Sequence, residues 1–398
     1  MRISSSTIYD SSVAAMNQQQ ARLLQTQQQI ASGSRISAAS DDPVAATRAL
    51  EISQSGAINT QYASNLDSAR NTLTLAESTL QAVTSLLQDV QTATINAGNG
   101  SLTSSSRQII ATDLTAKLQE LIGLANSTDG LGNYLFAGFQ SRTKPFADTA
   151  AGVCFFGDDG QHLVQVAANR QMASSDSGAD IFMRIRNGNG TFVTQPAAAN
   201  TGSGVVSSGS VITPALLTGN NYSVSFNVVG GVTTYDVTNT TTGGSVSAGT
   251  PYVSGQAISF DGMQLDIKGV PANGDTFTVV PSTNESLFTT ISDLINALNA
   301  PAVGANLANS VSRGLNNLDK ALNNVLTTQA TLGLRLNEID TLQTAGENIG
   351  LQFKKTLSQL QDTDYNKAAS DLNLQKTSLQ AAQQTFALVK DLSLFNYL

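Results

Sequence analysis

The sequence predicts a mainly α-helical protein with an inserted all-β domain, in which an elongated helical rod continues into a terminal coiled coil. Three observations support this fold class. Apolar residues recur every seven positions near both termini, as they do in coiled coils. The same spacing runs through two long inner segments, at about residues 43–97 and 306–360. Between residues 146 and 284 the chain is instead rich in Gly, Thr, Ser and Val, in the alternating pattern typical of β-strands.

Each terminal helix is predicted to carry a narrow apolar stripe on a polar surface of Gln, Asn, Ser and Ala. An isolated helix with so little apolar surface is marginal in water. We therefore expect these helices to become ordered together with several neighbours in an assembly. The two terminal stripes, as we call them, consist of Tyr9, Met16, Leu23 and Ile30 near the N-terminus and Tyr365, Leu372, Leu379 and Phe386 near the C-terminus.

The inner helices are predicted to form an intramolecular core. One should run from about Pro43 to Ala97 and stop at a Gly-Asn-Gly turn, and a shorter one should cover 104–126. A third should cover about 306–360, which at 1.5 Å per residue gives a rod of roughly 75 Å. The apolar columns that define these helices include Leu66, Leu73, Leu80 and Leu87 in the first helix and Val311, Leu318, Val325, Leu332 and Ile339 in the third.

A firm break separates the first terminal helix from the rod. It contains Gly33 and the run Ser40-Asp41-Asp42-Pro43. Ser40 or Asp42 can act as the N-cap of the next helix, because a side-chain oxygen there accepts an otherwise free backbone N–H. Pro43 suits the first helical position, where its missing N–H costs nothing. We predict that this segment is a joint between two layers of the molecule.

The central segment is predicted to contain β-hairpins. Tyr222, Val224, Phe226 and Val228 alternate with polar residues, and Gly230-Gly231 then supplies a tight turn before a second alternating run. Two further alternating segments, at 256–267 and 274–280, read as strands.

Composition excludes several classes of protein. Only 13% of the 398 residues are charged, and the formal net charge is -8. Nucleic-acid binders need a basic face, so no nucleic-acid partner is expected. No apolar run reaches the roughly 18–20 residues of a membrane span, and the N-terminus lacks the apolar segment of a secretory signal peptide. We therefore expect neither a membrane span nor a cleaved signal peptide.

No constellation of residues predicts catalysis. Cys154 and His162 are the only residues of their types. Cys154 lies in an apolar run and reads as a buried structural cysteine, whereas His162 should begin a strand. Asp158-Asp159-Gly160 lacks the ligand order of a calcium-binding loop, so a hairpin turn is favoured there. We expect no enzyme activity, no cofactor and no metal.

Several motifs resemble the bacterial flagellin family, which includes flagellin and flagellin-like hook-associated proteins. Residues 30–49 resemble its N-terminal motif and read IASGSRISAASDDPVAATRA. Residues 127–146 resemble the hook-associated members more than flagellin and read STDGLGNYLFAGFQSRTKPF. Residues 332–349 and the last forty residues resemble the C-terminal half of the fold. The resemblance covers roughly 1–146 and 285–398, and no motif is assigned in the β insert.

The resemblance implies a flagellin-like architecture. Residues 1–42 and 361–398 would pair as a terminal coiled coil in the axial core. Residues 43–145 and 285–360 would form the helical rod, and 146–284 an outward-facing β domain. The implied role is a structural adaptor that joins the flagellar hook to the filament and self-assembles into a ring through its terminal helices.

The resemblance also implies partners and a location. The partners would be copies of the same chain, a second hook-associated protein on the hook side, flagellin on the filament side and an export chaperone. The protein would lie outside the cell, after type III export. Two alternatives remain open at this point: flagellin itself, and, from another class, a secreted hydrolase with coiled-coil arms.

Overall fold

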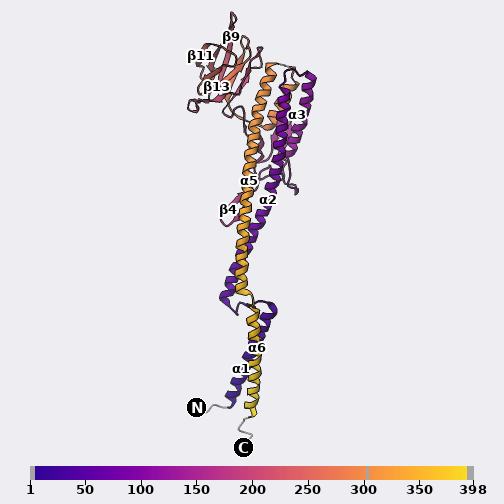
Figure 1. Cartoon of the computed structure of the whole chain (residues 1–398), viewed down its shortest axis with the longest axis vertical. Helices are drawn as coiled ribbons and strands as arrows, with labels where there is room; N and C mark the ends of the chain where they lie inside the picture. The colour runs from indigo at the N-terminus through magenta and orange to yellow at the C-terminus, as the bar shows by residue number, and fades with distance from the viewer. Residues whose placement is uncertain (1–4, 302–303, 392–398) are drawn as a thin grey trace. The chain divides into compact units, whose positions relative to one another are not determined.

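The computed structural model describes residues 5–301 and 304–391, and the chain divides into two compact units. Unit 1 consists of Met1–Ser64 and Thr341–Leu398, and unit 2 of Asn65–Asp340. Two long helices, α2 (Pro43–Ala97) and α5 (Ala305–Gln361), contribute residues to both units (Figure 1). The predicted bounds of the first of these helices, from Pro43 to Ala97, are confirmed.

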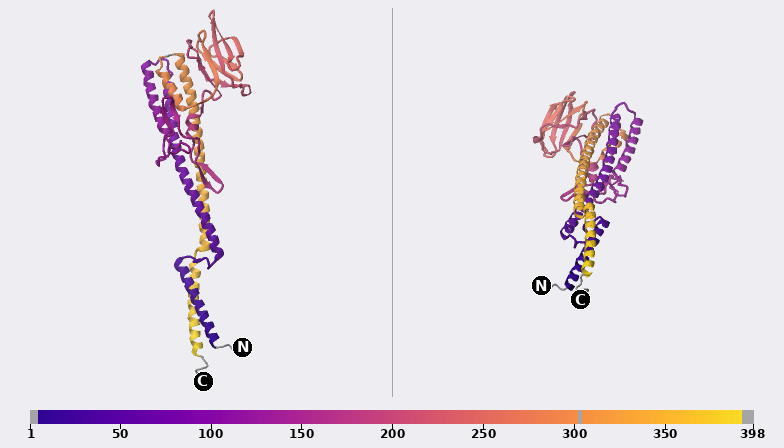
Figure 2. Two further views of the ribbon diagram at one scale, coloured as in Figure 1. Left: turned by 180° about the vertical axis from the view of Figure 1, so that it is seen from behind. Right: turned by 60° about the horizontal axis from the view of Figure 1, so that its bottom comes forward.

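Unit 1 is a set of paired helices. Helix α1 (Ser5–Ser32) and helix α6 (Tyr365–Asp391) lie side by side (Figures 1 and 2). The Tyr9 and Phe386 rings meet with their centroids 5.1 Å apart. In the same unit the Asn59 amide donates to the Gly346 carbonyl oxygen at 2.9 Å, so α2 and α5 also contact one another.

The helical part of unit 2 buries the predicted apolar columns. It contains the remaining parts of α2 and α5, together with α3 (Ser104–Ala125) and α4 (Leu287–Asn299). Thr84 on α2 donates to Gln329 on α5 at 3.3 Å. The predicted core of this region is therefore confirmed. The buried column residues are Leu66, Leu73, Leu80, Leu87, Val311, Leu318, Val325, Leu332 and Ile339.

Short hairpins follow α3 and pack beside the helices. Strand β1 (Phe146–Thr149) pairs with β2 (Gly152–Phe155), and β3 (Leu163–Ala167) with β4 (Arg170–Ala173). A π-helical turn, Ala179–Met183, leads to β5 (Ile185–Arg186), which pairs with β15 (Asn284–Glu285). Four fully buried aromatic rings surround one another here and join this region to α4: Phe136, Phe146, Phe182 and Phe288.

The larger β region consists of two facing sheets. The five-stranded sheet has the order β11-β10-β9-β14-β6, and the second has the order β12-β13-β7, with β8 also pairing with β13. Their buried core includes Tyr222, Phe226 and Phe277. The predicted hairpin is confirmed as β9 (Tyr222–Val229) and β10 (Val232–Asn239). The other strands are β6 (Phe192–Pro196), β7 (Val205–Val206), β8 (Ser210–Val211), β11 (Ser245–Pro251), β12 (Ala257–Phe260), β13 (Met263–Lys268) and β14 (Thr276–Pro281), and a 3-10 turn spans Pro214–Leu216.

The strands between 146 and 285 thus fall into two groups, whereas the sequence suggested one domain over 146–284. The two sheets that share a core span Phe192–Pro281. The β1–β2 hairpin instead packs with the helices through the buried Phe146 ring, which contacts Phe288 of α4. The β3–β4 hairpin is held to α2 by the hydrogen bond from Asn65 to the Gln165 carbonyl oxygen and to α5 by the ion pair of Arg170 with Glu338. The difference arises because alternation marks a strand but does not say which surface its apolar face covers.

Two buried asparagines of α5 bind the backbone of the β region. Asn309 accepts a hydrogen bond from the Val206 N–H at 2.9 Å and donates to the Gly204 carbonyl oxygen at 3.0 Å. Asn317 accepts from the Gly188 N–H at 2.8 Å and donates to the Glu285 carboxylate at 2.9 Å. These hydrogen bonds fix the β region to α5 in one register, since a displaced backbone would leave buried polar groups without partners.

Candidate assembly surface and joint

The terminal stripes lie on the paired helices α1 and α6 but are not enclosed by them. Tyr9 is 52% exposed and Tyr365 is 58% exposed. The six other stripe residues are only partly buried, although they have the spacing of a core: Met16, Leu23, Ile30, Leu372, Leu379 and Phe386. The pair of helices within one chain therefore covers only part of its apolar surface.

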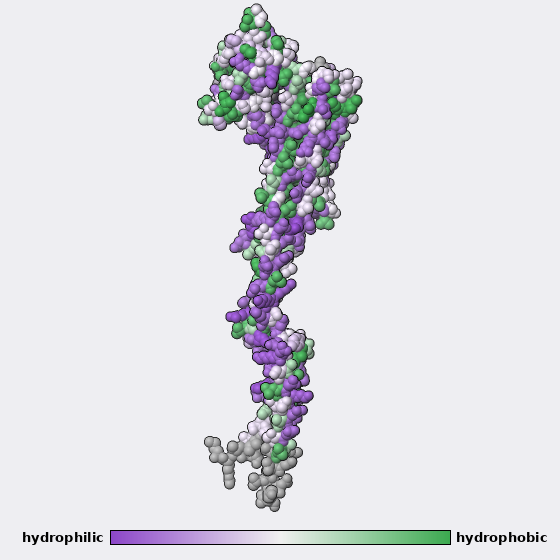
Figure 3. All heavy atoms as spheres, viewed as in Figure 1, coloured by the Kyte–Doolittle hydropathy of each residue, from purple (hydrophilic) through white to green (hydrophobic). Residues whose placement is uncertain are grey.

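Sequence reasoning missed three apolar residues of the same helices. Leu24, Leu374 and Leu388 lie outside the seven-residue columns and are each more than half exposed. Apolar residues, coloured green in Figure 3, interrupt the polar surface of these helices. The available signal was the position of Leu24 directly after Leu23, which widens the N-terminal stripe. Leu374 and Leu388 each lie two positions after a residue of the C-terminal stripe. A wider apolar face fits contact with more than one neighbouring helix.

Gly33 ends α1. Its N–H donates to the Gln29 carbonyl oxygen at 2.9 Å, and its φ of 71° lies in the left-handed region that glycine enters without strain. A Cβ at this position would lie 3.0 Å from the Tyr365 hydroxyl oxygen, at the start of α6. Gly33 therefore both closes the first helix and lets the second approach it.

The segment after Gly33 is hydrogen-bonded to the connection between α5 and α6. The Arg35 N–H donates to the Gln361 carbonyl oxygen at 2.6 Å, and the Thr363 N–H donates to the Gly33 carbonyl oxygen at 2.9 Å. Ser34 and Asp362 form an antiparallel bridge between these segments. We call residues 33–42 and 362–364 together the joint. The break predicted from the sequence is thus one of two segments that are hydrogen-bonded to each other.

Arg35 connects the end of one long helix with the start of the other. Its guanidinium donates to the Leu360 carbonyl oxygen at 2.7 Å and forms an ion pair with Asp42 at 3.2 Å. A cation suits the carbonyl end of α5, and a carboxylate suits the N–H end of α2. Both side chains are exposed to a third or more, so the ion pair adds little to stability. Its main effect is to fix the position of Arg35 between the two helix ends.

Asp42 is the N-cap of α2. Its Oδ1 accepts a hydrogen bond from the Ala45 N–H at 3.0 Å, and Pro43 occupies the first helical position. This bond and the neighbouring Arg35 lower the pKa of the Asp42 carboxyl below its ordinary value. Asp41 has a separate role, since its Oδ2 accepts from the backbone N–H groups of Ser37 and Ala38. Of the two predicted caps, Asp42 is confirmed, and Ser40 lies exposed within the joint.

The residues weighed for catalysis are dispersed. Cys154 is partly exposed on β2, so the prediction of a buried cysteine is wrong. Strand β2 belongs to a sheet of only two strands and is paired along one edge, with β1. His162 packs edge-on against Phe139, with ring centroids 5.3 Å apart. Within residues 5–301 and 304–391, no three His, Cys, Asp or Glu side chains are placed to share a metal ion.

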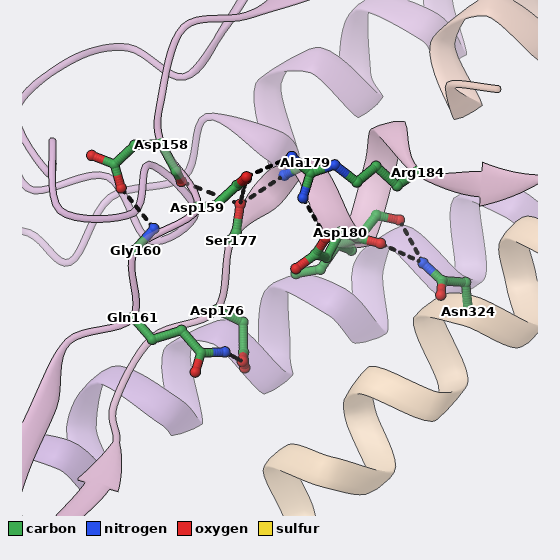
Figure 4. Close-up of polar contacts among 11 residues, drawn as sticks. Asp158, Asp159, Gly160, Gln161, Asp176, Ser177, Ala179, Asp180, Arg184 and Asn324 are labelled. Carbon is green, nitrogen blue, oxygen red and sulfur yellow. Dashed lines mark hydrogen bonds and ion pairs between the residues drawn. The ribbon is translucent and has the colours of Figure 1, made fainter. Parts of the chain in front are cut away.

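The Asp158-Asp159-Gly160 segment orders the loops around it (Figure 4). The Asp158 Oδ1 accepts hydrogen bonds from the N–H groups of Phe139 and Gly160, both at 2.8 Å, and these bonds lower the pKa of its carboxyl. Asp159 pairs with Arg184 at 2.6 Å. The predicted hairpin turn is wrong, since β2 and β3 belong to different hairpins and this segment connects them.

Comparisons with known families agree with this arrangement. The N-terminal helical region of bacterial flagellin matches residues 3–141, and its C-terminal helical region matches 315–398. The D2-like domain of flagellar hook-associated protein 1 matches 196–281, within the two facing sheets. Flagellar hook-associated protein 3 of Salmonella typhimurium is 28% identical over 400 residues, with 99% of each chain covered.

A solved structure decides the family. The hook-associated protein 3 of Legionella pneumophila is 32% identical and has a TM-score of 0.74, and the match covers 78% of this chain and 98% of that one. This chain belongs to the flagellar hook-associated protein 3 family. A second hook-associated protein 3 structure, FlgL from Xanthomonas campestris, is also 32% identical, with a TM-score of 0.72 and coverage of 77% and 99%.

Membership of the hook-associated protein 3 family confirms the flagellin-like fold and the hook-associated function predicted from sequence. Flagellin receives no better support from these comparisons. The relatives are structural flagellar proteins, and the chain is part of the flagellum, an extracellular appendage. No helix in the described part of the chain is long and apolar enough to cross a membrane.

Proposed function

We propose that this chain forms a ring at the junction between hook and filament, and that copies of the chain meet through α1 and α6. The observation that carries the proposal is the incomplete burial of the terminal stripes. Six residues with core spacing remain partly exposed when one chain is considered alone, and Tyr9 and Tyr365 are more than half exposed. Neighbouring copies would remove this apolar surface from water, which favours association.

The joint supports the same proposal. The connection from α1 to α2 and the connection from α5 to α6 are hydrogen-bonded to each other in the joint. The helices α1 and α6 would therefore meet a neighbouring copy together, as a pair. On this account Gly33, Ser40, Asp41, Asp42 and Pro43 position the assembly surface rather than form it. We expect the hook side of the ring to contact a second hook-associated protein and the filament side to contact flagellin. Delivery would use an export chaperone and the type III route, without a cleaved signal peptide.

The test uses a strain that lacks this chain and is complemented with variants. Leu379→Asp places a charge within the C-terminal stripe, where burial against a neighbour without a partner costs several kcal/mol. We expect hooks without filaments in electron micrographs and flagellin released into the medium. Gln380→Asp is the matched control, because the adjacent Gln380 is exposed, and it should restore filaments.

Two measurements keep the outcome interpretable. The circular dichroism spectrum and melting of purified Leu379→Asp should match those of the wild type, because the helical core of unit 2 lies elsewhere. Normal filaments in the Leu379→Asp strain would refute the assembly surface. Long self-polymers formed by the overproduced wild-type chain without a hook would instead favour a filament-subunit role.

A further inference from the structure

Arg107 is a buried cation without a counter-charge. It lies in the first turn of α3, after the turn that follows α2, and its relative exposure is 6%. No carboxylate forms an ion pair with it anywhere in residues 5–301 and 304–391. A buried charge is costly unless an opposite charge or a full set of hydrogen bonds compensates it.

The hydrogen bonds of Arg107 do not supply this compensation. The Nη1 group donates to the Leu102 carbonyl oxygen at 3.2 Å, and the buried Nε–H has no acceptor within the part of the chain that the structure describes. A guanidinium has five N–H groups and no acceptor, and the Leu102 carbonyl oxygen accepts from only one nitrogen of this group. Leu102 precedes the N-cap, and the bond to its carbonyl therefore turns the guanidinium back toward the N-terminal end of α3.

That end of α3 is itself positive. Thr103 is the N-cap and accepts a hydrogen bond from the Ser106 N–H at 3.2 Å, but the first turn has no acidic residue. The remaining N–H groups of the first turn point away from the helix and attract anions. A cation at this end is normally unfavourable. Helix α4 offers a contrast: Glu285 directly precedes its N-cap, Ser286, and supplies a negative charge.

We propose that Arg107 and the first turn of α3 form a binding site for an oxyanion, either a phosphate or a carboxylate. An oxyanion would accept from the free backbone N–H groups and from the guanidinium, which binds planar oxyanions in a fork. Such a positive site is unusual in a chain with 29 acidic and 21 basic residues. The oxyanion could be free in solution, or it could be an acidic side chain of a second copy.

The first experiment is a phosphate titration of the full chain, followed by amide chemical shifts at constant ionic strength. We expect saturable shifts at residues 104–107 and none at the start of α4. Arg107→Gln should weaken the apparent affinity by about tenfold or more, as expected for loss of a charged donor. Arg107→Lys should retain part of it. The exposed Arg142→Gln is the matched control and should bind as the wild type does.

A second experiment distinguishes the two sources. If phosphate binds at least tenfold more tightly than acetate and Arg107→Gln still supports filaments in the complemented strain, the ligand is a free anion. If acetate competes equally and Arg107→Gln loses filaments while its melting is unchanged, a carboxylate of another copy is the ligand. The absence of saturable shifts at 104–107 in the wild type would overturn the proposal without any variant. Equal shifts in a folded Arg107→Gln protein would also overturn it.

Discussion

The helical core of unit 2 and the paired terminal helices of unit 1 share one sequence pattern but differ in burial. Leu73, Leu80 and Leu87 are fully buried, at 0% exposure. Leu372, Leu379 and Phe386 recur at the same seven-residue spacing and stay partly exposed. The difference teaches that spacing identifies the apolar face of a helix, while the number of neighbouring helices decides whether that face becomes a core.

Three amide side chains show the same contrast between the two units. In unit 2 the Asn309 and Asn317 side chains both accept and donate hydrogen bonds. In unit 1 the Oε1 atom of Gln375 on α6 is buried and has no hydrogen-bond partner among the described residues. The two asparagine amides of unit 2 thus find partners within the chain, whereas the Gln375 amide oxygen of unit 1 has none among the described residues, which fits a surface that is completed by other chains.

The largest expected effect is a difference in unfolding free energy between alanine substitutions at two leucines, Leu80 and Leu379, that both lie in seven-residue columns. Leu80→Ala should lower the free energy of unfolding by about 3 kcal/mol, because a cavity forms in a packed core. Leu379→Ala should lower it by less than about 1 kcal/mol in the isolated protein, because its environment is already partly solvent. Urea titrations followed by circular dichroism measure both. Equal losses would break the comparison between the two regions.

A smaller effect is expected at the polar positions. Asn309→Ala leaves the Val206 N–H and the Gly204 carbonyl buried without partners and should cost about 2 kcal/mol. Gln375→Leu removes an unsatisfied oxygen and should raise the stability of the terminal pair by roughly 1 kcal/mol. The rate of amide hydrogen exchange at Val206 reports on Asn309→Ala, and the exchange rates along α6 report on Gln375→Leu. A destabilising Gln375→Leu would show that its amide has a partner within the single chain.

The smallest expected effect concerns the joint and its pH dependence. The folded-state pKa of Asp42 lies below the ordinary value of 3.8, mainly because its carboxylate accepts the Ala45 N–H. Its contribution is therefore present above pH 3.8 and is lost as the pH falls through the lower, folded-state pKa. Exchange of the Ala45 amide, corrected for intrinsic rates, should speed up only below that pH. Asp42→Asn keeps a capping oxygen and should remove this pH dependence, whereas Asp42→Ala should remove the protection at every pH.

Much of this fold was predictable because its signals are local. Pro43 and the Gly-Asn-Gly turn bound α2, and the apolar columns of α2 and α5 select the buried face of each helix. The joint was predicted as a break but not as a two-stranded structure, because Arg35 binds the Leu360 carbonyl across 325 residues of sequence. No local pattern contains such a contact. The burial of Arg107 was not predicted for the same reason, because it depends on the packing of α3.

The division of the β segment was also beyond local reasoning. Phe146 and Phe226 both lie in alternating strands, yet the first is buried against Phe288 of α4 and the second within the facing sheets. The partial exposure of Cys154 likewise depends on its place in a sheet of only two strands. Alternation gives the inward and outward faces of a strand, and tertiary packing assigns the partner.

The central claim is that the helices α1 and α6 become fully ordered through neighbouring copies of the chain. Hydrogen exchange read by mass spectrometry tests it most directly, on the purified monomer and on isolated hook–filament structures that contain the protein. The account predicts weak protection of residues 10–31 and 366–388 in the monomer, strong protection of both in the assembly, and unchanged strong protection of residues 66–90. Strong protection of residues 10–31 in the monomer would contradict it.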